Sequence, residues 1–252
     1  MPNGSYSLPD ILSRLSIDSL NEMQTASIAA NEQHNNVVLL SATGSGKTLA
    51  FLLPVLDLLD PGNKSTQALI VVPSRELAMQ IEKVFKSLGT SYKVTCCYGG
   101  HLRETEEHNL QQPPALLIGT PGRLADHIRR GNITTDAIET LVLDEFDKSL
   151  ESGFHEELAF IISALPALKK RILTSATEAV EIPEFIGLKD PVKLDFLSGS
   201  GEAPKGLAIK IVQSDEKDKL GTLFKLICHL GNRSTVVFCN HRESVERTSE
   251  YL

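Results

Sequence analysis

The chain has 252 residues, of which 41% are hydrophobic and 23% are charged, and its net charge is −7 at pH 7. These values are those of an ordinary globular protein that can bury one large core or two modest ones. No apolar run approaches the roughly 18 residues that span a bilayer, and the N-terminus lacks a basic region followed by an apolar one, so we expect no membrane segment and a cytoplasmic location.

Two helices are predicted before the first strand. Residues 8–20 carry apolar side chains at helical spacing, and residues 21–30, NEMQTASIAA, follow as a second helix. The next stretch, residues 37–48, reads VVLLSATGSGKT. An apolar run that resembles a buried strand leads here into a glycine-bearing loop, which ends in Lys-Thr at the start of the amphipathic run LAFLLPVLDLL.

This stretch predicts a phosphate-binding loop. Gly44 and Gly46 allow positive φ and a close approach of the backbone to an anion, and amides at the start of the helix would point at that anion. Lys47 would neutralise the β- and γ-phosphates, and the Thr48 hydroxyl would ligate Mg²⁺. A chance Gly-rich turn stays open as an alternative, because Ser41 stands where the G-x-x-x-x-G-K-[ST] pattern begins with Gly.

Strands and helices alternate after this loop. Short β-branched runs lie at residues 68–72, 93–98, 115–119, 140–143, 171–174 and 192–196. Helical patterns such as RELAMQIEKVFKSL and HEELAFIISAL lie between most of them. This alternation predicts an α/β fold with a mostly parallel sheet and helices on both faces, in which ligands bind at the carboxyl ends of the strands.

A second segment follows a predicted linker. Residues 198–206 are rich in Gly, Ser and Pro and are typical of a flexible connection. Residues 207–252 then predict a strand (LAIKIVQS), a helix (EKDKLGTLFKLICHL), a strand (STVVFCN) and the start of another helix. Because two strands and two helices cannot close an α/β core, we expect only the beginning of a second domain.

Two acidic residues, Asp144 and Glu145, end the apolar strand TLVL. In a phosphate-loop fold a carboxylate at this position can hold Mg²⁺ opposite Thr48, and an adjacent glutamate can deprotonate the attacking water. The alternative is a pair of solvated acids at a strand end. The phosphate loop about 95 residues upstream makes the catalytic interpretation the favoured one.

The cysteines and the charge restrict the other site chemistries. Cys96, Cys97, Cys228 and Cys239 form no Cys-x-x-Cys pair, so neither a zinc site nor a disulfide framework is indicated. The acidic balance leaves no broad positive field for a nucleic acid, which local donors and backbone amides would have to hold. His101, His108 and His127 show no ligand spacing, and we expect them to be solvated.

The order of motifs resembles the DEAD-box family of ATP-dependent RNA helicases. The motifs are Gln24, SATGSGKT (41–48), PSREL (73–77), GG (99–100), TPGR (120–123), DEFD (144–147), SAT (175–177) and VVFCN (236–240). The resemblance covers essentially the whole chain. It implies a RecA-like phosphate-loop domain at residues 1–197, the linker at 198–206, and a truncated second RecA-like domain at 207–252.

The resemblance also implies roles for individual residues. Gln24 would read adenine, Glu145, Asp144 and Lys47 would be catalytic, and Ser175 and Thr177 would hydrogen-bond Asp147 to couple the nucleotide state to domain closure. Thr48 and Asp144 would hold the Mg²⁺ ion. The implied ATP-binding residues are Gln24, Ser41, Ala42, Thr43, Gly44, Ser45, Gly46, Lys47 and Thr48.

The implied nucleic acid is RNA, held by its backbone and with little sequence specificity. The residues that correspond to the family's RNA contacts are Pro73, Ser74, Arg75, Gly99, Gly100, Thr120, Pro121, Gly122 and Arg123. For Arg75 and Arg123 a structural ion pair is the alternative. Nothing in the sequence demands an oligomer, and we expect a monomer.

The sequence also departs from the family. Phe146 replaces the small third residue of the DEAD signature, which should alter packing behind the acids, and Tyr6 is the one candidate for the aromatic that stacks on adenine. The arginines that the family's second domain supplies to the transferring phosphate lie beyond Leu252. Because such an arginine is worth about 10³ to 10⁵ in rate, we expect this chain to bind ATP but hydrolyse it poorly.

Two other functions stay open at this point. A related superfamily-2 motor acting on DNA would be favoured if DNA matched RNA in stimulating hydrolysis, since the 2′-hydroxyl distinguishes the two. A non-catalytic, ATP-gated RNA clamp is the second alternative, and the presence of Glu145 argues against it.

Overall fold

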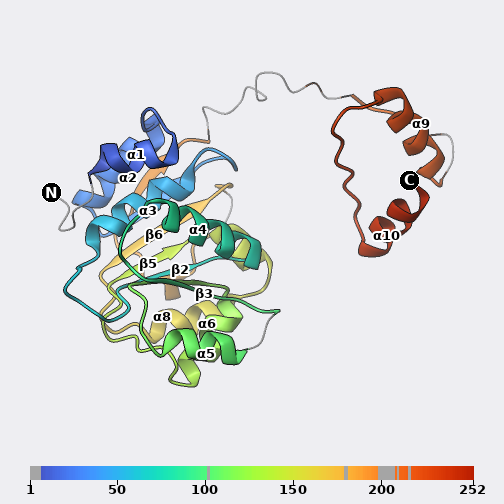
Figure 1. Ribbon diagram of the computed structural model, residues 1–252. Coiled ribbons are helices and arrows are strands. Elements are labelled where there is room, and N and C mark those ends of the chain that lie inside the picture. Colours follow the sequence, from blue (N-terminus) through green and yellow to red (C-terminus); the bar gives the residue numbers. More distant parts are fainter. Residues whose placement is uncertain (1–6, 101–102, 179–180, 198–207, 209, 215–216) are drawn as a thin grey trace. The chain divides into compact units, whose positions relative to one another are not determined.

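The computed structural model describes residues 7–100, 103–178, 181–197, 208, 210–214 and 217–252 (Figure 1). The chain divides into two compact units, Met1–Glu202 and Ala203–Leu252, and each is described by itself. The expected linker at residues 198–206 and the aromatic candidate Tyr6 lie outside the described residues. Among the described helices none is long and apolar enough to cross a lipid bilayer.

A seven-stranded sheet forms the centre of the first unit, and all of its strand pairs are parallel. The order across the sheet is β3-β4-β2-β5-β6-β1-β7. The strands are β1 (Asn36–Leu40), β2 (Ala68–Val71), β3 (Val94–Cys97), β4 (Leu116–Gly119), β5 (Thr140–Leu143), β6 (Lys170–Ser175) and β7 (Val192–Asp195). The predicted α/β class with a parallel sheet is confirmed.

Helices cover both faces of this sheet, as Figure 1 shows. The first unit contains helices α1 (Leu8–Leu15), α2 (Glu22–Gln33), α3 (Lys47–Leu58), α4 (Arg75–Ser87), α5 (Arg103–Leu110), α6 (Pro121–Arg129), α7 (Phe146–Glu151), α8 (His155–Ser163) and the short 3₁₀ helix η1 (Glu184–Ile186). Alternate strand residues face alternate layers: Ile70 packs with Phe51 of α3 and Phe85 of α4, whereas Leu69 packs with Leu124 of α6 and Leu158 of α8. All six of these side chains are buried.

The predicted helix over residues 8–20 is shorter in the structure. Ser7 caps the start of helix α1, because its hydroxyl accepts a hydrogen bond from the Asp10 amide, and Ser16, which has φ of 55°, follows the last helical residue, Leu15. A residue in the left-handed conformation ends a helix because it turns the chain away from the helical path. The second predicted helix is α2, which extends to Gln33.

Helix α3 differs from the amphipathic helix that its sequence predicts. It is buried nearly all round, and Pro54 lies inside it. Proline has no amide hydrogen, so the carbonyl of Ala50 loses its helical donor. The Ser27 hydroxyl of α2 donates to that carbonyl at 2.7 Å, which joins α2 to α3 and satisfies the acceptor.

Strand register brings the candidate residues to one edge. Parallel strands end at the same side of a sheet, and residues 41–48, 73–75, 99–100, 120–123, 144–147 and 175–177 all follow carboxyl ends or lie at them. Leu143 of β5 pairs with Leu173 of β6, and Leu40 of β1 pairs with Ser175 of β6. The strand β6 therefore lies between the phosphate loop after β1 and the acids after β5.

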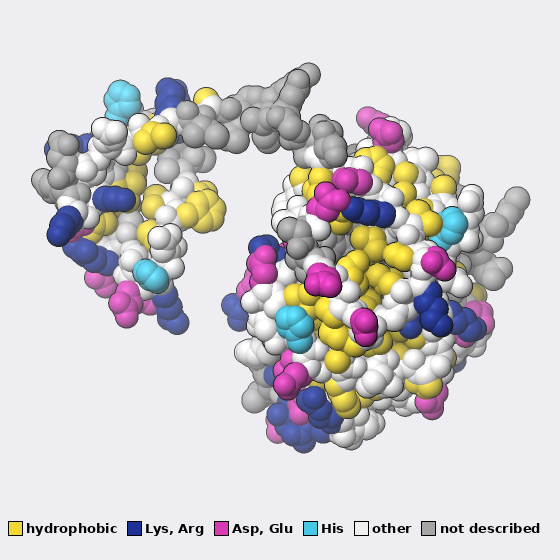
Figure 2. Space-filling view, turned by 180° about the vertical axis from the view of Figure 1, so that it is seen from behind, with side chains coloured by type: hydrophobic (Ala, Val, Ile, Leu, Met, Phe, Trp, Pro, Cys, Tyr) yellow, Lys and Arg dark blue, Asp and Glu magenta, His cyan; other side chains and the backbone are white. Residues whose placement is uncertain are grey.

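The second unit contains helices α9 (Leu220–Leu230) and α10 (Arg242–Tyr251). Phe224 and Tyr251 of these helices make an edge-to-face contact with ring centroids 6.4 Å apart. The strands predicted for LAIKIVQS and STVVFCN are wrong for the described residues of this unit, which have no strand assignment. A strand needs hydrogen-bonding neighbours, and the described part of this unit offers none. Apolar side chains consequently lie at its surface (Figure 2). Phe238 among them has 92% of its area exposed.

Candidate functional site

The loop between β1 and α3 has the geometry of an anion cradle. Gly44 and Gly46 have φ of 81° and 92°, the left-handed region that favours glycine. Gly46 is the N-cap of α3 and has no side chain to accept the first-turn amides, which have no acceptor within a helix. A β-carbon at Gly46 would lie 2.6 Å from Gln24 Nε2, so the loop is packed tightly from behind. These amides are free to bind an anion at a helix N-terminus.

Lys47 lies within this loop and is buried. Its Nζ atom donates to the carbonyls of Ser41 at 2.7 Å and Ala42 at 3.4 Å. The Ser41 and Ser45 hydroxyls form a 2.6 Å hydrogen bond across the loop. The loop thus holds an ammonium group among its own carbonyls, and that donor set fits a polyphosphate.

Gln24 is engaged with this loop rather than exposed. It forms a capping box with Asn21: the Gln24 amide donates to Asn21 Oδ1 at 2.9 Å, and Gln24 Oε1 accepts from the Asn21 amide at 3.0 Å. Gln24 Nε2 donates to the Gly46 carbonyl at 3.2 Å, and Asn21 Nδ2 donates to the Ser45 carbonyl at 3.0 Å. The side-chain amide of Gln24 can donate two hydrogen bonds and accept two, so these contacts leave it able to bind a further partner. The reading of adenine by Gln24 stays a prediction.

Asp144 is buried at the end of β5. The Thr174 hydroxyl of β6 donates to Asp144 Oδ1. Burial raises the pKa of the Asp144 carboxyl, while this hydrogen bond and the charge of Lys47 oppose the rise. A cation beside the carboxylate would offset the cost of burying its charge. Thr48 and Asp144 therefore fit a Mg²⁺ site in chemical type, and their role as ligands stays a prediction.

Glu145 stands in a strained backbone position. Its φ is 47° and its ψ is 49°, a left-handed conformation that residues other than glycine rarely adopt. It is the N-cap of α7, and its amide donates to Thr174 Oγ1 at 3.1 Å. The single Thr174 hydroxyl thus contacts both acids. Phe146, the next residue, is buried and lines an apolar cavity of about 170 Å³ with Val38.

The predicted coupling contacts are present in part. Thr177 Oγ1 donates to Asp147 Oδ2 at 3.1 Å, but the Ser175 hydroxyl donates to the Thr177 carbonyl at 2.7 Å. The predicted Ser175 to Asp147 bond is therefore replaced by a local turn, as short hydroxyl side chains often prefer. Asp147 is fully buried, and its Oδ1 atom has no hydrogen-bond partner among the described residues.

The predicted RNA contacts lie along the same edge of the sheet. Ser74 caps α4 by accepting from the Leu77 amide, and Pro121 occupies the first turn of α6. Arg75 is exposed, forms a 2.6 Å ion pair with Glu76, and lies next to Gly100, which has φ of 101°. A hollow of about 570 Å³ is lined by Arg75, Lys86, Lys93, Tyr98, Gly99 and Gly100, among others.

Arg123 differs from Arg75. Only 15% of its side chain is exposed, and Nη1 lies 3.3 Å from Oε2 of the buried Glu106. The ion-pair alternative for Arg123 is therefore the arrangement that the structure has. On the face that Figure 2 shows, acidic and basic side chains are interspersed.

His127 corrects one expectation from the sequence. It was expected to be solvated, but it is fully buried, with Nε2 2.7 Å from Glu106 Oε2. His108 is exposed, and His101 lies outside the described residues. Sequence reasoning also missed Glu106, whose partners lie 8 to 21 residues away, and Thr174. The Asn21 to Gln24 spacing, by contrast, is a readable capping signal.

Comparisons with known proteins agree with this geometry. A family model described as DEAD/DEAH box helicase matches residues 21–185. ATP-dependent RNA helicases eIF4A of Botryotinia fuckeliana and Schizosaccharomyces pombe are 35% and 36% identical over 86% of this chain. The chain spans 56% of the length of each. The solved structure of a hypothetical ATP-dependent RNA helicase from Sulfolobus tokodaii matches with a TM-score of 0.66 and 27% identity, over 75% of this chain and 57% of that one.

Proposed function

The chain belongs to the DEAD/DEAH box helicase family, and from this premise we propose that it is the part of an ATP-dependent RNA helicase that binds ATP, Mg²⁺ and the RNA backbone. The observation that carries the proposal is the arrangement around β6. The phosphate loop follows β1 on one side of this strand, and Asp144 and Glu145 follow β5 on the other. This arrangement supports a site in which phosphate donors, a metal-ligand pair and a base lie at one edge of the sheet.

The residues of this edge divide the work of phosphoryl transfer. Lys47 and the first-turn amides of α3 bind the phosphates, and Thr48 and Asp144 hold Mg²⁺. The bound Mg²⁺ ion supplies positive charge to the phosphate oxygens. Glu145 accepts the proton of the attacking water, and the hydrogen bond from its amide to Thr174 fixes the backbone from which it projects.

Nucleotide state reaches the rest of the protein through the DEFD and SAT segments. Thr177, which follows the end of β6, donates a hydrogen bond to Asp147. Asp147 lies three residues after the proposed metal ligand Asp144, so a displacement of the acidic segment would move Thr177 as well. Ser175 supports this contact by holding the Thr177 carbonyl. We propose that this pair transmits nucleotide binding to a second domain.

RNA is the proposed nucleic acid, bound along residues 73–75, 99–100 and 120–122, whereas Arg123 is paired with Glu106. These segments offer helix N-termini, glycine backbone and an exposed arginine, Arg75, all of which recognise phosphate. Such contacts read sugar and phosphate, so binding should depend little on base sequence. Because the chain spans 56% of the length of the relatives, we propose that it binds ATP and hydrolyses it slowly by itself.

Two substitutions test the proposed site. In Lys47→Ala, affinity for a fluorescent ATP analogue should fall about tenfold or more, because a charge-assisted contact to phosphate is lost. In Glu145→Gln, affinity should be kept while hydrolysis falls to background. Unchanged affinity in Lys47→Ala would contradict the assignment of the phosphate loop.

Hydrolysis should then be compared without nucleic acid, with single-stranded RNA and with DNA of the same sequence. Slow turnover that RNA raises and DNA does not is the expected result, because the 2′-hydroxyl separates the two. Equal stimulation by DNA would favour a DNA motor. Turnover in the wild type that equals that of Glu145→Gln under every condition, with ATP still bound, would favour an ATP-gated clamp.

A further inference from the structure

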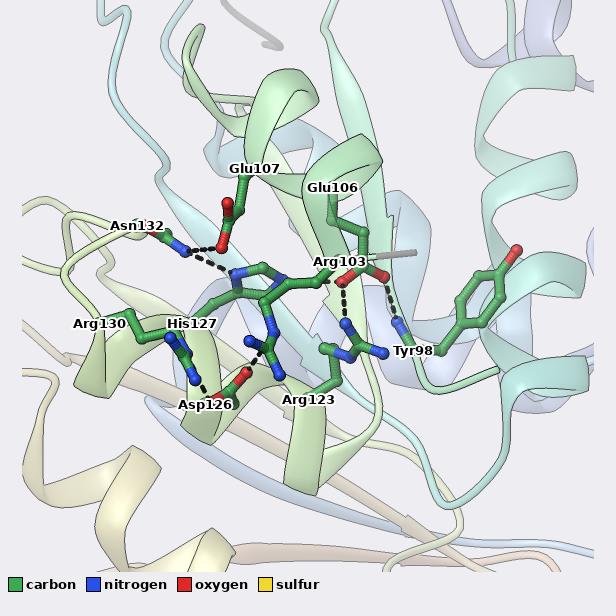
Figure 3. A network of polar contacts seen from close by, with 9 residues as sticks. All are labelled: Tyr98, Arg103, Glu106, Glu107, Arg123, Asp126, His127, Arg130 and Asn132. Atoms are coloured by element: carbon green, nitrogen blue, oxygen red, sulfur yellow. Dashed lines mark hydrogen bonds and ion pairs between the residues drawn. The ribbon is translucent and has the colours of Figure 1, made fainter. Parts of the chain in front are cut away.

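A buried carboxylate joins the two segments proposed to hold RNA (Figure 3). Glu106 of α5 has 2% of its side chain exposed, and three partners converge on it. Its Oε1 atom accepts from the Tyr98 amide at 2.8 Å. Its Oε2 atom lies 2.7 Å from His127 Nε2 and 3.3 Å from Arg123 Nη1. A single side chain therefore contacts both the backbone after β3 and the helix α6.

These partners lie next to the proposed RNA contacts. Tyr98 immediately precedes Gly99 and Gly100, whereas Arg123 ends the Thr120–Arg123 segment at the start of α6. The Thr120 amide donates to the Cys97 carbonyl at 3.0 Å, so the two segments are joined by backbone as well. The position of the Glu106 carboxylate fixes the spacing between the glycine loop and the N-terminus of α6.

The histidine in this cluster is held at both ring nitrogens. Asn132 Nδ2 lies 3.1 Å from His127 Nδ1 and donates to Glu107 Oε1 at 3.2 Å. With Nδ1 accepting from Asn132, the proton of His127 is on Nε2 and points at Glu106. The ring therefore adds a directed hydrogen bond to the carboxylate, and the guanidinium of Arg123 supplies the compensating charge.

The same cluster includes Cys97, whose sulfur lies with the Glu106 and His127 donor atoms inside a span of 4.8 Å. Two ligand atoms at about 2 Å from one tetrahedral zinc ion are roughly 3.3 Å apart. The 2.7 Å separation of Glu106 Oε2 and His127 Nε2 is that of a hydrogen bond instead. The positive charge of Arg123 beside the same oxygen also disfavours a cation, so the cluster is a fixed support.

We propose that Glu106 is a positioning residue for RNA binding, and that Arg123 serves this carboxylate and not an RNA phosphate. The inference rests on the proposed function of the preceding subsection. A buried ion pair tolerates little displacement, because leaving either charge unpaired is costly. That intolerance suits a residue that holds two binding segments in register.

The sign of one charge change tests the proposal. Removing a negative charge beside an RNA site normally strengthens binding, and it would release Arg123 for a phosphate. If Glu106 positions the site, Glu106→Gln instead weakens binding of a fluorescent single-stranded RNA, by about tenfold. Glu104→Gln is the matched control: Glu104 is exposed on the same helix, and its loss of charge should leave affinity unchanged or slightly raised.

Affinity for a fluorescent ATP analogue and the thermal midpoint are measured for each variant. In Glu106→Gln the ATP affinity should stay at the wild-type value, whereas the thermal midpoint should fall because Arg123 loses its partner. A double variant, Glu106→Gln with Arg123→Gln, guards against unfolding because it removes both charges together. Its RNA affinity should equal that of Glu106→Gln alone, since the two residues act as one unit. A lower RNA affinity in the double variant than in Glu106→Gln would identify Arg123 as an independent phosphate contact and overturn the proposal.

Three other results have distinct meanings. Wild-type or tighter RNA binding in Glu106→Gln would overturn the positioning role and leave the proposed function intact. No RNA binding by the wild type would overturn the proposed function and this inference with it. One zinc ion per chain, lost in Cys97→Ser, would identify the cluster as a metal site and contradict the positioning role.

Discussion

Two regions of this molecule with similar sequence patterns have different structures. In the first unit, runs such as ALIV and TLVL are strands with neighbours on both sides, and Leu69 in the first of them is fully buried. In the second unit the run STVVFCN has no strand assignment among its described residues, and Val236 has 76% of its area exposed. A β-branched run thus forms a strand only where neighbouring strands are present to pair with it.

The helices of the two units differ in the same sense. Helix α4 of the first unit buries Ala78, Ile81 and Phe85 against the sheet. Helix α9 of the second unit carries as apolar a sequence but has no buried residue. An apolar sequence at helical spacing therefore does not by itself bury one face of the helix.

The reactivity of the cysteines should separate the units most strongly. Cys97 on β3 is fully buried, and burial raises the pKa of its thiol, whereas Cys228 on α9 is exposed. Alkylation of Cys97 requires the sheet to open, at a cost of about 5 kcal/mol or more, which corresponds to at least three powers of ten in rate. Timed alkylation with mass spectrometry measures the two rates.

Matched variants retain only Cys97 or only Cys228, with serine at the other three cysteine positions. Similar alkylation rates in the two would show that the second unit buries its thiol as the first does.

Truncation of a phenylalanine should matter in one unit only. Phe85 is fully buried between α4 and the sheet, and Phe238 is 92% exposed. Phe85→Ala should lower the free energy of unfolding by about 3 to 5 kcal/mol, because a cavity replaces a packed ring. Phe238→Ala should change it by less than about 0.5 kcal/mol. Urea unfolding followed by circular dichroism is the measurement, since the chain has no tryptophan.

An equal and large loss in Phe238→Ala would indicate that residues 234–240 are packed in solution. The proposed lack of strand partners in the second unit would then fail.

Helix capping should give the smallest difference. Ser7 caps α1 through the Asp10 amide, whereas His241 at the N-cap of α10 makes no side-chain cap bond, although its backbone is extended as a cap requires. Ser7→Ala should cost about 1 kcal/mol of stability, and His241→Ser should stabilise α10 by a similar amount. Backbone chemical shifts report the population of α10. No gain in helix for His241→Ser would show that capping does not limit this helix.

Much of the first unit could be predicted from sequence because its inner strands, β1, β2, β4, β5 and β6, are buried on both faces. Continuous apolar runs such as residues 68–72 and 140–143 are typical of parallel strands and need no tertiary knowledge to be found. The ends of helices were harder. The end of α1 at Ser16 depends on one left-handed residue, and the fully buried α3 differs from an amphipathic helix only through its packing.

The site divides in the same way. Residues 41–48 and Asp144 with Glu145 are contiguous segments, so their spacing alone indicates their chemistry. The Glu106 to His127 pair joins positions 21 residues apart on two different helices, and only the fold brings them together. The family resemblance predicted a hydrogen bond from Ser175 to Asp147. Only the fold shows that the Ser175 hydroxyl donates instead to the Thr177 carbonyl, within its own turn.

Glu145 has a consequence for how this protein can change. Its left-handed backbone costs a non-glycine residue on the order of 1 to 3 kcal/mol, and glycine at this position would remove that strain together with the carboxylate. With Glu145 in its proposed role as the base, stability and activity oppose each other at this single residue, and random substitution followed by selection for thermal tolerance alone would tend to eliminate the glutamate. The proposed role thus gives a reason for a glutamate in a backbone conformation that favours glycine.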